Sequence, residues 1–177
     1  GLHSTLLDAG GLIFRHYSDI ATMYRPQNNQ LLDWLVFRSR NKIFDTQIAH
    51  SDSRLLVKCL SNKGVVWYSP DQDFGLKYGV MAPFFGVPAA TITAQRRFVE
   101  VSNAKAMSLH FYRDDDQKQH YHIHITPALE NYPTQDELAD AITINQLMEQ
   151  QINLAPTQYM WFHRRFKTRP DVYPSIY

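Results

Sequence analysis

The sequence predicts an α/β fold: a single domain in which helices flank a mixed β-sheet. The 177 residues suit one domain, and a composition of 44% hydrophobic and 20% charged residues is typical of a globular chain. Leucines at helical spacing, such as Leu31, Leu32 and Leu35, occur before a short apolar run at 64–69. Helices that alternate with strands in this way indicate an α/β sheet.

The first predicted element is a helix over 4–14. Thr5 and Asp8 fit a capping box, in which a hydroxyl and a carboxylate three residues later satisfy free backbone N–H groups. The pair Gly10-Gly11 is expected to weaken the middle of this helix.

A strand over 19–26 follows, and Pro26 ends it because proline has no N–H for the ladder. The segment 28–40 has helical periodicity, with Asn28 and Asn29 as candidate caps.

A further helix is predicted to begin near Ser51 or Ser53 and to end by Gly64. The apolar run 64–69 that follows is typical of a strand that is buried on both faces.

The second half predicts fewer regular elements. Residues 70–91 are rich in Gly, Pro and aromatic residues and have no clear period, which favours a long, functional irregular segment. A helix over 90–104 and a hairpin over 105–129 around an acidic turn are expected next. A Thr cap and helically spaced apolar residues predict a last helix over 134–155, ending before Pro156.

Composition excludes several classes of protein. No apolar run approaches the ~20 residues of a membrane-spanning helix. The single cysteine, Cys59, excludes an intrachain disulfide, and a net charge of +1 does not indicate a nucleic-acid binder. Because His3 lies so near the terminus, where chains fray, we expect the chain to be a fragment of a longer protein.

His3 and Asp8 form the main candidate site. Five positions on a regular helix do not place two side chains on one face, so His3 has to precede the helix and fold back. There, a carboxylate that holds a neutral imidazole makes it a general base for a hydroxyl group. The spacing alone leaves both interpretations open, helix capping and catalysis.

Four further stretches accompany the H-x4-D pattern: MYRPQNNQLLDWL, VVWYSPDQDFG, FFGVPAAT and APTQYMWFHRRFKTRP. Together they resemble the secondary (lauroyl/myristoyl) acyltransferases of lipid A biosynthesis, within the glycerolipid acyltransferase superfamily. The chain departs from that family in two respects. Asp8 stands where a Glu is usual, and the upstream region with its membrane-anchoring helix is missing.

The resemblance implies a glycerol-phosphate-acyltransferase-like fold with its N-terminal part missing, and residues 1–177 as one catalytic domain without an internal boundary. It makes His3 the base and Asp8 its partner. The implied donor is an acyl thioester on acyl carrier protein, and the implied acceptor is a hydroxyl of an acyl chain on a lipid A precursor. Neither a covalent intermediate nor a metal or other cofactor is implied. The expected location is the cytoplasmic face of the bacterial inner membrane, with contact to the membrane surface.

The resemblance also suggests substrate-binding residues. Arg40 aligns with a functional arginine, and a guanidinium suits a phosphate or a developing oxyanion. Asp71 aligns with the acidic residue of a superfamily motif, and Arg25 is a second candidate for the acceptor's phosphates. The structural alternatives are a solvated helix end for Arg40, turn residues for Asp71 and the weaker candidate Asp73, and a strand end for Arg25.

Two clusters have competing interpretations. His120, His122 and His124 share one face of a strand, which could suggest zinc, but a solvent-facing strand edge is favoured. The basic and aromatic tail contributes candidate contacts to acyl carrier protein or to anionic head groups: Arg164, Arg165 and Lys167.

Two rival functions remain beside the enzyme. One is a catalytically silent lipid- or carrier-binding module. The other is an RNA-binding domain, which is the weakest because no aromatic RNP-like strand motif is present, so no nucleic-acid partner is expected.

Overall fold

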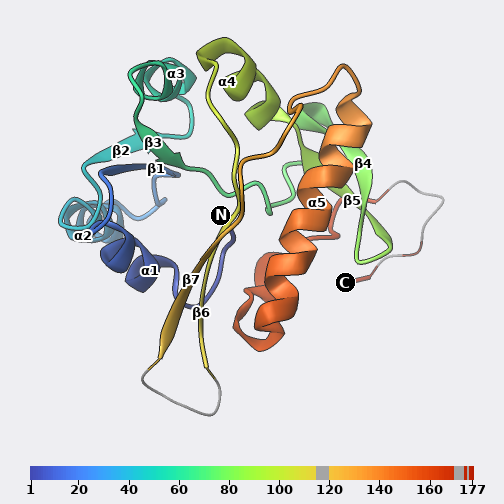
Figure 1. Ribbon diagram of the computed structural model, residues 1–177. Helices are drawn as coiled ribbons and strands as arrows, with labels where there is room; N and C mark the ends of the chain where they lie inside the picture. Colours follow the sequence, from blue (N-terminus) through green and yellow to red (C-terminus); the bar gives the residue numbers. More distant parts are fainter. Residues whose placement is uncertain (115–119, 170–173, 175) are drawn as a thin grey trace.

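A computed structural model describes residues 1–114, 120–169, 174, 176 and 177. The predicted α/β class is confirmed, but the described strands form three small sheets and not one mixed sheet. One sheet is parallel, with the order β2-β1-β3, and the other two are the antiparallel pairs β4-β5 and β6-β7. Figure 1 shows the parallel sheet on the left, with α5 and the β4-β5 pair on the right.

The parallel sheet has β1 (Ile20–Tyr24) at its centre, between β2 (Thr46–Ala49) and β3 (Val65–Trp67). Because both pairings are parallel, the carboxyl ends of β1 and β3 lie at the same edge. β3 is not buried on both faces as predicted, since Val65 is 40% exposed.

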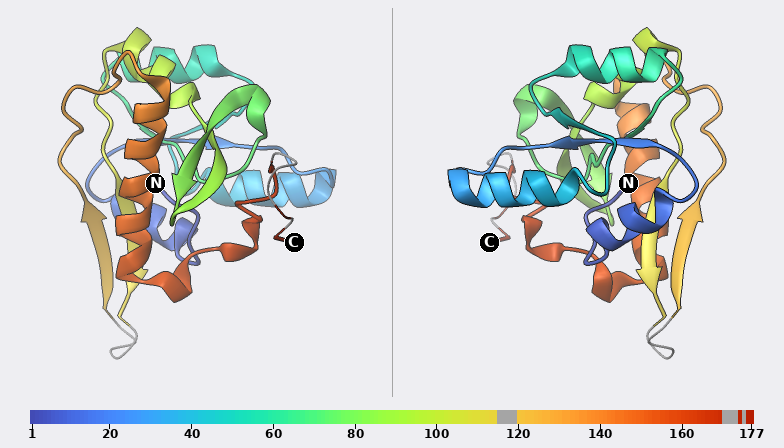
Figure 2. Two further views of the ribbon diagram at one scale, coloured as in Figure 1. Left: turned by 90° about the vertical axis from the view of Figure 1, so that its right-hand side faces the viewer. Right: turned by 90° about the vertical axis from the view of Figure 1, so that its left-hand side faces the viewer.

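Three helices belong to this half of the chain: α1 (Leu7–Phe14), α2 (Gln30–Arg40) and α3 (Ser53–Ser61). Asn29 caps α2 by accepting the N–H of Leu32, and Asp52 caps α3 in the same way. No residue of α2 is buried, and Figure 2 shows this helix projecting from the body of the molecule.

The capping-box prediction for α1 is wrong. The helix begins at Leu7 after an N-cap at Leu6, and no side chain caps it. Its glycine pair has a packing role: a Cβ at Gly10 would overlap the ring of Phe111, and one at Gly11 would crowd Phe44. The two glycines therefore let α1 lie directly on the core.

Residues 70–91 are more regular than predicted. They contain a short 3₁₀ helix, η1 (Leu76–Tyr78), and the hairpin of β4 (Gly79–Phe84) and β5 (Val87–Ile92). The predicted helix over 90–104 is correspondingly shorter, because α4 spans only Ala94–Ser102.

The C-terminal half ends with α5 (Glu137–Leu154), which stops before Pro156 as predicted. Its cap is Asp136, which accepts two backbone N–H groups, and not Thr134. Two single 3₁₀ turns follow: η2 (Pro156–Gln158) and η3 (Trp161–His163).

The predicted hairpin is present as β6 (Leu109–Arg113) and β7 (Tyr121–Ile125), and most of its acidic turn lies outside the described residues. His122 Nε2 is 2.8 Å from a carboxylate oxygen of Asp114, and His124 Nδ1 is 2.9 Å from Gln151 Oε1 on α5. Within the described ranges, no group of three or more His, Cys, Asp or Glu side chains is arranged to hold a metal ion.

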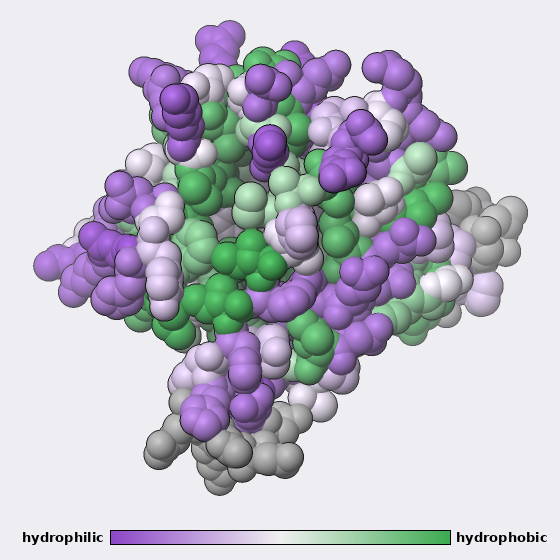
Figure 3. All heavy atoms as spheres, in the orientation of Figure 1, coloured by the Kyte–Doolittle hydropathy of each residue, from purple (hydrophilic) through white to green (hydrophobic). Residues whose placement is uncertain are grey.

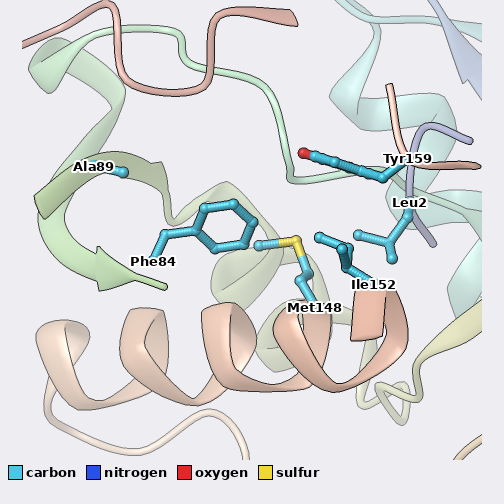
Figure 4. Packing of buried hydrophobic residues seen from close by; sticks show 6 residues of the cluster. All are labelled: Leu2, Phe84, Ala89, Met148, Ile152 and Tyr159. Carbon is cyan, nitrogen blue, oxygen red and sulfur yellow. The ribbon is translucent and has the colours of Figure 1, made fainter. Parts of the chain in front are cut away.

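Two apolar clusters position the elements that surround the N-terminal segment. Figure 4 shows the first, in which Met148 and Ile152 of α5 pack against Phe84, Tyr159 and Leu2. The second packs Trp67 of β3 edge-on against Phe44 and Phe111, which joins the parallel sheet to the β6-β7 hairpin. In the part of the chain that is described, no helix is both long and apolar enough to cross a bilayer.

Candidate active site

The segment that carries His3 is held by backbone hydrogen bonds to a distant part of the chain. The Thr5 N–H donates to the Gln158 carbonyl over 2.9 Å, and the Met160 N–H donates to the His3 carbonyl over 3.1 Å. Ser4 and Tyr159 form an antiparallel bridge between these two bonds. A short strand pairing therefore fixes the backbone of His3 before α1 begins.

His3 is bound to Asp71, in the segment that follows β3. Its Nδ1 lies 2.6 Å from Asp71 Oδ1, and its backbone N–H donates to Asp71 Oδ2 over 2.8 Å. The Asp71 side chain is fully buried, whereas the imidazole is 21% exposed. No hydrogen bond from the described residues reaches His3 Nε2, so this nitrogen is available to a substrate.

The carboxylate of Asp71 is kept ionised by His3. Burial acts to raise the pKa of Asp71, but the hydrogen bond and the charge of the His3 imidazole, with its backbone N–H, outweigh burial and lower that pKa. An ionised Asp71 accepts a hydrogen bond from the Nδ1–H group of His3. This bond favours the tautomer with the proton on Nδ1, which leaves Nε2 free to take up a proton.

Asp8 does not contact His3. Its Oδ1 accepts a hydrogen bond from Arg40 Nε over 3.2 Å, and its side chain is 57% exposed. The predicted orienting contact from Asp8 to His3 is therefore wrong, because the buried Asp71 occupies that position. The structure instead joins Asp8 and Arg40, two residues that sequence analysis assigned to separate tasks. Their roles in a reaction stay predictions.

A second histidine, His163, lies against the first. The two ring centroids are 4.6 Å apart, and His163 Nδ1 is 3.4 Å from Gln72 Nε2. Burial, followed by the charge of His3, lowers the pKa of His163 and keeps its imidazole neutral. No local feature of the sequence indicates this proximity, because it depends on the fold of the C-terminal segment.

An apolar cavity of about 620 Å³ is lined in part by residues close to the His3–Asp71 pair in the sequence. Pro70, next to Asp71 in the sequence, contributes to its wall. The other walls come from α3, β3, α4, β6 and α5, with Leu56, Trp67, Phe98, Leu109 and Leu147 among the lining residues. Apolar side chains also gather at the centre of the face shown in Figure 3, between the parallel sheet and α5. The volume falls within the range of small-molecule sites.

The basic residues of the tail differ in exposure. Arg165 is 1% exposed, and its guanidinium donates to the Ala90 carbonyl, to Thr91 Oγ1 and to Asn145 Oδ1. The prediction that Arg165 contacts a carrier protein or a head group is therefore wrong, because it is part of the core. Arg164 and Lys167 are exposed and remain candidates for such a contact.

Arg25 lines a polar pocket to which neither Asp8 nor Arg40 contributes. It follows β1 and lines this pocket together with Gln72, Asp73, His163 and Lys167. Asp73 has a structural task there: its Oδ1 accepts the Gly75 N–H over 2.9 Å, and its Oδ2 accepts the Thr168 N–H over 2.7 Å.

The fold and the site define a class of protein: an α/β protein with a carboxylate-held histidine beside an apolar cavity, at the carboxyl edge of a parallel sheet. A family model described as "Bacterial lipid A biosynthesis acyltransferase" matches residues 1–168. The chain belongs to this family.

Curated relatives agree with this assignment. The chain is 38% identical over 178 residues to the lipid A biosynthesis palmitoleoyltransferase of Escherichia coli (strain K12) and 35% identical to the lauroyltransferase of the same strain. It is 36% identical over 180 residues to a lipid A biosynthesis acyltransferase of Haemophilus influenzae. Each comparison covers 100% of this chain but only 58% of the relative, so the chain spans little more than half their length.

Proposed function

We propose that the protein transfers a fatty acyl chain from acyl carrier protein to a hydroxyl group on an acyl chain of a lipid A precursor. Membership of the lipid A biosynthesis acyltransferase family supports acyl transfer, and relatives are named for palmitoleoyl, lauroyl and myristoyl transfer. The observation that carries the proposal is the hydrogen bond between His3 Nδ1 and the buried Asp71, beside an apolar cavity.

In the proposed mechanism His3 is the general base. Nε2 takes the proton of the acceptor hydroxyl while the oxygen attacks the thioester carbonyl, and Asp71 stabilises the imidazolium that forms. The tetrahedral intermediate then collapses, the C–S bond breaks, and His3 returns the proton to the leaving thiolate. The new ester and the free carrier thiol account for all atoms, so no covalent enzyme intermediate is required.

The apolar cavity supplies a place for the acyl chain. Its lining side chains are mostly apolar, so a hydrocarbon tail that binds there is removed from water. Each buried CH₂ group contributes roughly 0.8 kcal/mol to binding. Pro70, which directly precedes Asp71, is part of the cavity wall. In the proposed complex the acyl chain lies in this cavity with its thioester end toward Gly1 and Pro70, the lining residues that precede His3 and Asp71 in the sequence.

Arg40 and Asp8 are proposed to act as a unit. The Arg40 guanidinium suits a phosphate of the acceptor or the developing oxyanion, and Asp8 holds its Nε in place. In this arrangement Asp8 supports catalysis through Arg40, and not through His3.

Contact with a membrane surface is supported by α2. Its exposed apolar side chains include Leu31, Leu32, Trp34 and Leu35, with Leu31 68% exposed. Arg38 of the same helix lies over the Trp34 ring, at 5.2 Å from its centroid. Exposed apolar residues beside arginines are typical of interfacial helices on anionic lipids. We place the protein at the cytoplasmic face of the bacterial inner membrane, where a carrier-bound donor and a lipid acceptor meet.

Contact with acyl carrier protein is assigned to the exposed part of the tail. Arg164 and Lys167 provide positive charge, and Phe162 is 77% exposed beside them. This combination of basic and aromatic side chains fits an acidic protein partner.

The rival function is a lipid- or carrier-binding module without catalysis, which the exposed position of Asp8, away from His3, would favour. Mass spectrometry of a lipid A precursor incubated with the complete protein and acylated carrier protein distinguishes the two. The enzyme adds the mass of one acyl chain, and His3→Ala abolishes that addition. Binding of both substrates without any added mass would establish the rival.

A further inference from the structure

The polar pocket beside His163 has the composition of an anion site. Its volume is about 490 Å³, and its lining side chains include Arg25, Asp73, His163 and Lys167. These residues come from three separate segments: the end of β1, the loop after β3, and the segment from η3 onward. The first two meet at the carboxyl edge of the parallel sheet, where α/β proteins commonly bind ligands.

Among the described residues, the Arg25 and Lys167 side chains of this pocket have no ion-pair or hydrogen-bond partner. Both residues are exposed. The one carboxylate in the pocket, Asp73, accepts hydrogen bonds from Gly75, from the Thr168 N–H and from the Thr168 hydroxyl. Because its oxygens are already engaged in tying the loop to the tail, two positive charges face one satisfied negative charge.

His163 connects the pocket to the base. It lines the pocket, and its ring centroid lies 4.6 Å from that of His3. Its Nε2 is buried and has no hydrogen-bond partner among the described residues. A buried imidazole N–H without an acceptor is a donor that a bound anion would satisfy.

We propose that Arg25, Lys167 and His163 form a binding site for a phosphate group of a substrate. The proposal rests on the proposed acyl transfer for the identity of that substrate. Two sources share this chemistry: a sugar phosphate of the lipid acceptor, and the phosphodiester of the prosthetic arm that carries the acyl thioester. With the phosphate in this pocket and the acyl chain in the apolar cavity, a substrate is fixed on two sides of His3.

The first test is kinetic and uses the double variant Arg25→Gln/Lys167→Gln in the complete protein. Loss of one charged hydrogen bond weakens binding about 10- to 100-fold, so loss of two raises KM for the phosphate-bearing substrate about 100-fold or more while kcat changes little. The control is Arg54→Gln/Lys58→Gln on α3, which removes two exposed charges that do not line the pocket and leaves both KM values unchanged.

The choice of substrates identifies the source of the phosphate. If the acceptor supplies it, the acceptor KM rises in the double variant, and removal of the acceptor's phosphates abolishes the difference between the variant and the wild type. If the carrier arm supplies it, the KM for acyl-phosphopantetheine, a donor with the phosphate but without the carrier protein, rises in the double variant, whereas the KM for acyl-pantetheine, which lacks the phosphate, does not. Unchanged KM values for both substrates in an active double variant would overturn the proposal.

A direct binding measurement separates this proposal from the proposed function. Inorganic phosphate is titrated into histidine-labelled protein, and the imidazole resonances of His163, assigned with His163→Gln, are followed by NMR. Saturable shifts that the Arg25→Gln/Lys167→Gln variant loses support the site even if no acyl transfer is detected. Identical titrations of the wild type and the double variant would refute the site, whatever the enzyme assay shows.

Discussion

The imidazole of His3 is bound to the carboxylate of Asp71, 68 residues further along the chain, with 2.6 Å between Nδ1 and Oδ1. The same carboxylate also accepts the backbone N–H of His3. Asp71 therefore fixes both the ring and the backbone of the proposed base. The nearby acid in the sequence, Asp8, is bound to Arg40 instead.

The pairing of Asp8 with Arg40 predicts a specific pattern of kinetic coupling. Asp8→Asn lowers kcat/KM at least about tenfold because Arg40 loses its positioning partner, whereas Asp8→Glu keeps the charge and stays active. In an Arg40→Gln background, Asp8→Asn has little further effect. Steady-state kinetics of the double-mutant cycle measure this. A full additional loss in that background, with no additional loss beside His3→Ala, would restore Asp8 as the partner of His3.

Burial of Arg165 predicts a large loss of stability on its removal. Arg165→Met leaves Thr91 Oγ1, the Ala90 carbonyl and Asn145 without a donor and costs about 3–5 kcal/mol of unfolding free energy. The neighbouring Arg164→Met, at an exposed position, costs within about 0.5 kcal/mol. Denaturant unfolding of both variants gives the comparison, and equal stabilities would show that the Arg165 network contributes nothing.

The close approach of α1 to the β6-β7 hairpin predicts that Gly10→Ala is destabilising. Alanine is favoured over glycine in a helix by about 1 kcal/mol, but the added Cβ overlaps the buried Phe111 ring and costs about 1–3 kcal/mol through overpacking. Leu12→Ala, at a half-exposed position of the same helix, serves as the control. A Gly10→Ala protein with a raised melting temperature would argue against this packing.

His110 predicts acid sensitivity of the fold. Burial, with a smaller contribution from the charge of His124, lowers the pKa of His110 to about 4 from its ordinary value of 6.5. The unfolded chain therefore binds this proton more readily between these pH values. Stability falls as pH drops from about 6.5 to about 4, by about 3 kcal/mol at the lower end.

Thermal unfolding from pH 7.5 to pH 4.5 tests this prediction, with His110→Leu as the comparison because it removes the titrating ring and keeps an apolar side chain. The variant loses less stability than the wild type on acidification. Parallel pH profiles for the two proteins would mean that His110 does not titrate in this range.

Local signals in the sequence predicted the elements that depend on neighbouring residues. The cap of α2 is Asn29, one of the two expected candidates, because an Asn side chain at a helix start can accept the N–H three residues ahead. The β4-β5 hairpin was missed, since Pro83 and Pro88, which face each other across the two strands, hide the strand pattern. The family resemblance indicated both His3 and Asp71 as site residues.

The remaining site features depend on contacts between distant segments. No local rule pairs residues 3 and 71, and the backbone bridge between Ser4 and Tyr159 that holds His3 joins the two ends of the chain. Likewise, the run of basic residues in the tail does not reveal that Arg165 points inward while Arg164 stays exposed. The family motif therefore suggested Asp8, the nearest acid, as the partner of His3, whereas the structure pairs His3 with the buried Asp71.

The turnover of Asp71→Asn, measured beside Asp8→Asn and His3→Ala in the complete protein, tests the central claim most directly. An amide cannot hold the Nδ1–H tautomer as a carboxylate does, so Asp71→Asn is predicted to lower kcat by about 10²–10⁴-fold with little change in KM. Added to His3→Ala, it lowers kcat no further. A folded Asp71→Asn protein that keeps more than a tenth of wild-type kcat would contradict the assignment of Asp71 as the partner of His3.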